Sequence, residues 1–293
     1  MQLELREGGT IIDMSFYAKQ LLEGKDFKEA SSPSTKRTFE VDEGGPLLDD
    51  EEKKYFHSTV AKLLFMAKRA RPDLLTEISF LCTWVQGATQ QDMGKLERVL
   101  GYVRATQEQV MVLHAQTMQN IRAYVDAEFV LHSYSKSHTG VMVYVGETLV
   151  YVSSKKQKCM SKSPAEAELI GLTDNLGFVE LFQEFAEFLT GKKVNVPIIF
   201  QDCSTVVTLV MKGGSIVRTK HLCARMNLGK EMVDHERVHV VYIKAAEMKA
   251  DGFSKPFDPA EFRKFARMVQ GIFLASDNRW ALYDIEEQED DED

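Results

Sequence analysis

Between residues 119 and 254 the spacing of the apolar residues changes, and this change limits the fold more than any other feature. Three consecutive stretches of strand length, IRAYVDAEF, GVMVYVG and TLVYVSS, alternate or run apolar and are rich in β-branched and aromatic residues. We expect them to form an antiparallel meander. The next predicted elements are a helix from Pro164 to about Thr190, a strand in VNVPIIFQD, helices in STVVTLVM and over about 218–234, a strand in RVHVVYIK and a short helix in AEMKADGFSK. This order predicts a mixed α/β fold with helices on both faces of a five-stranded sheet.

Residues 1–118 show mainly helical spacing. Apolar residues recur at helical intervals in MSFYAKQLLEGK, YFHSTVAKLLFMAKRA, PDLLTEISFLCTWVQGA and GKLERVLGYVRAT. The acidic stretch at about 41–54, VDEGGPLLDDEEKK, contains glycine and proline and is predicted to be a linker. We therefore expect a small helical region ahead of the α/β domain.

Two glutamates lie close together where the long helix begins, in SPAEAELIGL. Ser163 followed by Pro164 is a strong helix start, because the hydroxyl caps free N–H groups and the proline ring suits the first helical position. Glu166 is three residues after the cap, the spacing of a capping box. Glu168 cannot share that role, since two residues rotate it by about 200° around the helix. Only one of the two glutamates therefore has a local explanation.

Three further acids are candidates for the same site. Each has a local alternative: Asp126 as a strand-end acid, Asp202 as a helix N-cap, and Asp251 as an ordinary acid of a short helix. Neighbouring strands bring their ends close together, so these acids and Glu168 could converge. Converging carboxylates need cations, and oxygen ligands favour Mg²⁺ or Mn²⁺, a pair of which can act on a phosphodiester.

Six segments together resemble the ribonuclease H domain of copia-type retrotransposon polyproteins, in the same order and spacing: IRAYVDAEF, HTGVMVYVG, YVSSKKQKCMSKSPAEAELIGL, IIFQDCSTVV, RTKHLCARMNLGKEMV and EMKADGFSKPF. The resemblance spans about residues 119–258. It implies a ribonuclease H-like mixed five-stranded sheet flanked by helices. It also implies that four acids bind two Mg²⁺ ions, with Mn²⁺ as an alternative; matched one by one, they are Asp126, Glu168, Asp202 and Asp251.

The resemblance continues upstream. GTIIDMSFYAKQLLEGKDF, KLLFMAKRARPDLLTEISFL and KLERVLGYVRAT resemble the C-terminal, thumb and connection part of a copia-type reverse transcriptase. The paired aspartates of a polymerase strand are not found, since Asp49–Asp50 and Asp290–Asp291 lie in polar runs. The resemblance therefore implies a polyprotein fragment that cleaves the RNA strand of RNA–DNA hybrids without polymerising DNA. A separate palm and fingers chain is a candidate partner.

The expected organisation has four parts. Residues 1–118 form the reverse transcriptase remnant and residues 119–258 the ribonuclease H-like domain; residues 259–283 form a helical extension and residues 284–293 an acidic, disordered tail. The sequence departs from the family at three places within the matched segments. Ala127, Glu128 and Phe129 replace the usual acid and tryptophan after the first acid, Arg225–Met226–Asn227 replaces the usual R-Y-H, and a histidine shortly before the fourth acid is missing.

The distribution of charge along the chain limits which classes of partner it can bind. The net charge of −8 equals the eight acids of the last ten residues, so the rest of the chain is close to neutral. Two segments are locally basic. We expect four of their residues to hold nucleic-acid phosphates: Lys155, Lys156, Arg218 and Lys220. Ordinary exposed loops would have the same basic composition.

Four widely separated cysteines suggest neither zinc nor disulfides, and no apolar run reaches the length of a membrane span. We expect a cytoplasmic protein of a retroelement particle, or a nuclear one, that is not secreted and has no membrane partner. The alternative to a nuclease is a catalytically silent retroelement-derived module that binds nucleic acid or protein.

Overall fold

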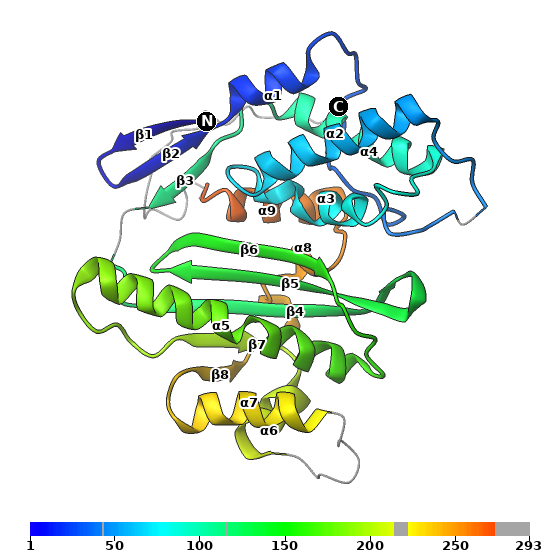
Figure 1. Ribbon diagram of the computed structural model, residues 1–293. Coiled ribbons are helices and arrows are strands. Elements are labelled where there is room, and N and C mark those ends of the chain that lie inside the picture. The colour runs from blue at the N-terminus through cyan, green and yellow to red at the C-terminus, as the bar shows by residue number, and fades with distance from the viewer. Residues whose placement is uncertain (43, 115–116, 214–221, 273–293) are drawn as a thin grey trace.

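The computed structural model describes residues 1–42, 44–114, 117–213 and 222–272, and contains two β-sheets (Figure 1). The larger sheet has the order β6-β5-β4-β7-β8. Its strands are β4 (Ile121–His132), β5 (Lys136–Val145), β6 (Thr148–Lys156), β7 (Ile198–Gln201) and β8 (His239–Tyr242). Strands β4, β5 and β6 form the expected antiparallel meander, whereas β7 runs parallel to β4 and β8 parallel to β7. This mixed sheet is ribonuclease H-like and confirms the predicted fold class.

Helices cover both faces of the large sheet. Apolar residues of β4 and β5 pack on one face against the first half of the long helix α5 (Pro164–Thr190) and against two further helices, α6 (Ser204–Lys212) and α7 (Cys223–Asp234). The opposite face carries Tyr124, Met142 and Tyr144 and packs into a second core. That core includes α8 (Asp251–Ser254), α9 (Pro259–Val269) and the helices of the first 118 residues.

The N-terminal region contributes four helices and a small sheet. The helices are α1 (Ser15–Leu22), α2 (Asp50–Ala67), α3 (Leu75–Cys82) and α4 (Gln90–Ala105). This region also contains a short 3₁₀ turn, η1 (Pro72–Leu74), and two further 3₁₀ turns lie after residue 118, η2 (Ser133–Ser135) and η4 (Ala245–Glu247). The small antiparallel sheet joins β1 (Gln2–Arg6), β2 (Gly9–Asp13) and β3 (Met111–His114). The helical spacing predicts a mainly helical region and does not indicate this sheet, because β2 pairs with a strand about 100 residues away, which local periodicity cannot reveal.

The prediction of an acidic linker at about 41–54 is wrong for the second half of this stretch. Helix α2 already begins at Asp50, because the Asp49 side chain accepts hydrogen bonds from the N–H groups of Glu51 and Glu52. The Glu52 carboxylate in turn accepts the Asp49 N–H, which completes a capping box. The acids that suggested an exposed linker therefore stabilise a helix N-terminus. The acidic tail, residues 284–293, lies outside the described residues.

Two buried histidines join the large sheet to the N-terminal helices. His132 Nε2 lies 2.7 Å from His138 Nδ1, and His138 Nε2 lies 2.6 Å from the Ser154 hydroxyl. The rings of Phe39 and Phe80 pack against His132 with centroids 5.4 and 5.9 Å away. Burial, and next the charge of Lys156, lowers the pKa of His132 to about 4. Burial also lowers the pKa of His138 well below its usual value.

We predict that this pair destabilises the protein in mild acid. Below about pH 6.5 the unfolded chain protonates both histidines while the folded protein keeps them neutral, so the free energy of unfolding falls as the pH falls. Between pH 7 and pH 5 the loss is about 2 kcal/mol for His132. Urea unfolding of wild type and His132→Gln at both pH values measures it: the variant should lose less. His57→Asn, at an exposed position of α2, is the control. Equal losses in wild type and His132→Gln would contradict the prediction.

Candidate active site

The first candidate acid, Asp126, lies within β4 and not at its end. Strand β4 continues to His132, and Asp126 pairs in register with Gly140 of β5. On its other side the parallel ladder to β7 ends with Tyr124 opposite Phe200. Asp126 and Asp202 each follow this last pair by two residues, so they are neighbours. Asp126 is 5% exposed and accepts a short hydrogen bond from the Ser254 hydroxyl.

Glu168 reaches the same place from helix α5. Ser163 caps this helix, since its hydroxyl accepts the Glu166 N–H at 3.2 Å. The Glu166 carboxylate accepts the N–H of Lys162 and not that of Ser163, so the predicted capping box is replaced by a contact one residue earlier. A Cβ added to Gly171 would lie 3.1 Å from the Thr139 side chain, so α5 packs closely on the sheet one turn after Glu168.

Asp202 follows β7 directly. The N-cap of α6 is Cys203, whose N–H bonds to the side chain of Gln201, so Asp202 does not serve as the N-cap. Gln201 also donates its amide to Glu168 Oε2 at 3.3 Å. Asp202 is therefore not a helix N-cap, the local role that the sequence offered for it. It lies beside the other acids instead.

Three of the four acids converge. One carboxylate oxygen each from Asp126, Glu168 and Asp202 lies within 4.8 Å of the other two. Burial, and next the charges of Asp126 and Asp202, raises the pKa of Glu168 to about 9. Burial and the charge of Asp126 also raise the pKa of Asp202. Without a cation, burial and the neighbouring acids therefore favour the protonated carboxyl group of Glu168.

Asp251, the first residue of α8, lies beside this triad but outside the group of oxygens within 4.8 Å. Its Oδ2 atom pairs with Lys255 Nζ at 2.9 Å, while its Oδ1 atom is buried and has no hydrogen-bond partner. Burial, and next the charge of Asp126, raises the pKa of Asp251 to about 6. The structure thus brings all four predicted acids to one region, with Asp251 paired to a lysine.

No protein-family model matches the chain. The chain is 25% identical over 215 residues to a retrovirus-related Pol polyprotein from transposon RE2 of Arabidopsis thaliana. This match covers 73% of the chain. A second Pol polyprotein, from transposon TNT 1-94 of Nicotiana tabacum, is 24% identical over 215 residues. The chain is homologous to part of these plant transposon polyproteins. It spans 15% of the first relative and 16% of the second.

Among solved structures, RNase H1 from the halophilic archaeon Halobacterium salinarum is similar to part of the chain. The match has a TM-score of 0.34 and 12% sequence identity, and covers 46% of this chain and 93% of that protein. The order and directions of the five strands described above carry the assignment of the fold.

Lys155 and Lys156, two predicted nucleic-acid contacts, lie at the end of edge strand β6. They are two strands from Asp126, about 10 Å at the usual strand spacing. Their side chains point to opposite faces, since successive strand residues alternate. The Lys155 ammonium lies 5.8 Å from the Phe178 ring centroid on the α5 face. The other two predicted contacts, Arg218 and Lys220, lie outside the described residues.

Sequence reasoning missed three polar partners of the acids. Gln201 directs its amide to Glu168, Ser254 bonds to Asp126, and Lys255 pairs with Asp251. Ser254 and Lys255 follow Asp251 by three and four residues, which places them on one face of a helical turn. That spacing within ADGFSK was the signal that could have identified them.

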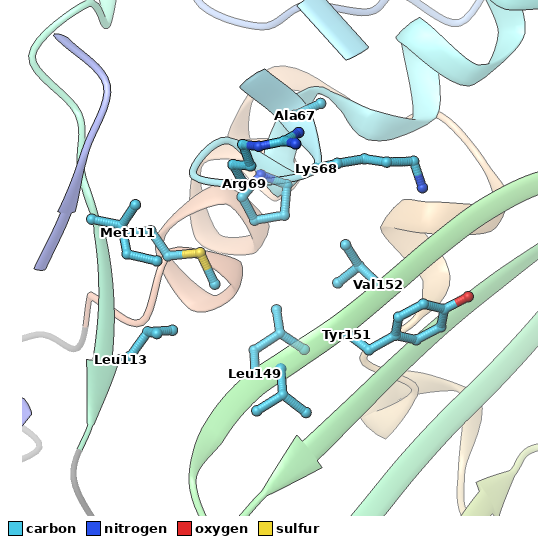
Figure 2. Close-up of a pocket in the computed structure, with 11 residues that line it drawn as sticks. Ala67, Lys68, Arg69, Met111, Leu113, Leu149, Tyr151 and Val152 are labelled. Carbon is cyan, nitrogen blue, oxygen red and sulfur yellow. The ribbon is translucent and has the colours of Figure 1, made fainter. Parts of the chain in front are cut away.

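A separate pocket of about 350 Å³ lies between the small sheet, the end of α2 and β6 (Figure 2). Met111, Leu113, Leu149 and Val152 give it apolar walls, with the basic residues Lys68 and Arg69 at one end. None of the four acids lines it. The chemistry suggested by the acids therefore belongs to the sheet and not to this pocket.

Proposed function

We propose that the chain is a metal-dependent endonuclease that cleaves the RNA strand of RNA–DNA hybrids, as the ribonuclease H part of a copia-type polyprotein. The observation that carries this proposal is the convergence of Asp126 of β4, Glu168 of α5 and Asp202, the residue after β7, within 4.8 Å. Homology to transposon Pol polyproteins supports it. A palm and fingers chain of a reverse transcriptase is the protein partner that this proposal implies, in a retroelement particle of the cytoplasm or in the nucleus.

The donor set fits hard divalent cations. All donors are carboxylate oxygens, which favour Mg²⁺ and Mn²⁺ over softer metals. The buried, partnerless Oδ1 atom of Asp251 and the raised pKa of Glu168 both indicate missing positive charge. The residues that would hold two Mg²⁺ ions are Asp126, Glu168, Asp202 and Asp251.

When bound, Mg²⁺ would supply an activated water and stabilise the leaving 3′ oxygen, so that cleavage would give 5′-phosphate and 3′-hydroxyl ends. The protein orients the ligands: Gln201 holds the Glu168 carboxylate, and Ser254 holds that of Asp126. Lys155 and Lys156 would bind phosphates away from the cut, together with Arg218 and Lys220. RNA is selected through 2′-hydroxyl contacts across the shallow minor groove.

The proposal predicts that Asp202→Asn lowers hybrid cleavage by at least about 100-fold, because losing one cation ligand costs about 3 kcal/mol of transition-state stabilisation. The measurement uses the full chain, Mg²⁺ and a hybrid labelled on either strand, with EDTA as the metal-free control. Asp234→Asn, an exposed position on α7, should cleave like wild type.

If neither wild type nor Asp202→Asn cleaves the hybrid while both still bind it, the proposed nuclease activity is overturned. That result would favour the catalytically silent binding module. Cleavage of the DNA strand, or of a DNA duplex at a similar rate, would overturn the proposed substrate. Equal activity in EDTA would overturn the metal requirement.

A further inference from the structure

Helix α8, which carries Asp251, is only four residues long and depends on its surroundings for its position. A single helical turn gains too little from its own hydrogen bonds to be stable alone, so tertiary contacts must hold it. The place of the Asp251 carboxylate beside the triad is therefore decided by whatever packs against α8. Two sides of this short helix are fixed by contacts that the proposed function does not explain.

The sheet holds α8 from one side. A Cβ added to Gly140 of β5 would lie 2.7 Å from both the carbonyl carbon of Phe253 and the N atom of Ser254. Only glycine lets the two backbones approach so closely. Gly140 is also the register partner of Asp126, which accepts the Ser254 hydroxyl. This contact ties α8 to the first acid.

The N-terminal region holds α8 from another side. The Thr76 hydroxyl, on α3, donates a buried hydrogen bond of 2.7 Å to the carbonyl oxygen of Gly252. Thr76 is 2% exposed and 176 residues distant in sequence. Gly252 directly follows Asp251, and a Cβ added to it would lie 2.6 Å from the Phe265 ring of α9. The carbonyl belongs to a helix end, where intrahelical partners are lacking.

We propose that Thr76 is a positioning residue for the nuclease site: its hydroxyl fixes the Gly252 carbonyl and thereby holds Asp251 beside the triad. This inference rests on the proposed function, because it treats Asp251 as a cation ligand. It gives the helical N-terminal region a direct role in the site. Without the hydroxyl, the Gly252 carbonyl is buried with no donor, and α8 shifts to find one.

The test compares Thr76→Val, which keeps the shape but removes the donor, with Thr76→Ser, which keeps the donor. Calorimetric titration with Mn²⁺ should show about 5- to 10-fold weaker ion binding for Thr76→Val, the loss expected for one buried hydrogen bond. Cleavage should need more Mg²⁺, with an unchanged KM for the hybrid. Thr76→Ser should restore both values. Thr59→Val, at a buried threonine of α2, should bind Mn²⁺ like wild type.

Wild-type Mn²⁺ affinity in Thr76→Val, or failure of Thr76→Ser to restore it, would overturn the inference while leaving a wild-type nuclease intact. Absence of Mn²⁺ binding and cleavage in the wild type would instead overturn the proposed function. Should Thr76→Val not fold, Thr76→Ala replaces it, since alanine suits a helix better than valine. Weakened Mn²⁺ binding in that variant supports the inference, and unchanged binding overturns it.

Discussion

Glu168→Gln is expected to abolish cleavage and at the same time to stabilise the metal-free protein. Glutamine cannot supply a charged ligand, so cleavage should fall by about 1,000-fold or more, equivalent to about 4 kcal/mol. In EDTA at pH 8 the free energy of unfolding should rise by about 2 kcal/mol or more, because the folded wild type must keep a proton on Glu168 that the unfolded chain releases, whereas glutamine needs none. Hybrid cleavage and urea unfolding measure the two effects.

The sign of the stability effect follows from the raised pKa of Glu168. The folded protein holds this proton up to about pH 9, whereas the unfolded chain releases it near pH 4.5. This contribution to stability is therefore full below about pH 4.5 and is lost as the pH rises toward 9. The glutamine variant, which is always neutral, should not show the loss, so its advantage over wild type should grow from pH 6 to pH 8.

Glu166→Gln is the matched control, since it makes the same change two residues earlier on α5. Its carboxylate contacts the start of the helix and not the triad, so cleavage should stay close to wild type. Equal losses of cleavage in the two variants would show that the helix start matters and not the position of Glu168. A destabilised Glu168→Gln protein in EDTA would contradict the raised pKa of Glu168 in the folded protein.

Asp73→Ala should be the most destabilising single substitution considered for the N-terminal region. The Asp73 carboxylate pairs with Arg71 at 2.9 Å and accepts the Tyr102 hydroxyl at 2.9 Å. Arg71 also donates to the carbonyl and hydroxyl of Thr106, and its side chain is 2% exposed. Removing the aspartate leaves a buried guanidinium without its counter-charge, at a cost of about 3–5 kcal/mol.

Urea unfolding at pH 7 measures this loss. Asp234→Ala is the control: it breaks the exposed Lys230–Asp234 pair on α7 and should cost less than about 1 kcal/mol. A double variant, Arg71→Met with Asp73→Leu, should recover most of the loss, because it removes both buried charges. A loss below 1 kcal/mol for Asp73→Ala would mean that Arg71 finds water or another partner.

Most of the large sheet and its long helix could be predicted because their signals are local. The alternation in β4, β5 and β6 has a period of two residues, and the start of α5 needs only Ser163 and Pro164. The same locality misled us at about 41–54, where acids look alike in a linker and in a first helical turn. The small sheet was missed because β2 finds its second partner in β3, far along the chain.

The sequence by itself determined which segments become strands and helices of the α/β part, and which glutamate of SPAEAELIGL lacks a local role. Only the tertiary structure decided that Asp126 lies in the middle of a strand, that Lys255 pairs with Asp251, and that α3 supports α8. The physical reason is distance along the chain. Helix starts and strand alternation depend on residues within about four positions, whereas the acids and their supports meet only after the sheet has brought remote segments together.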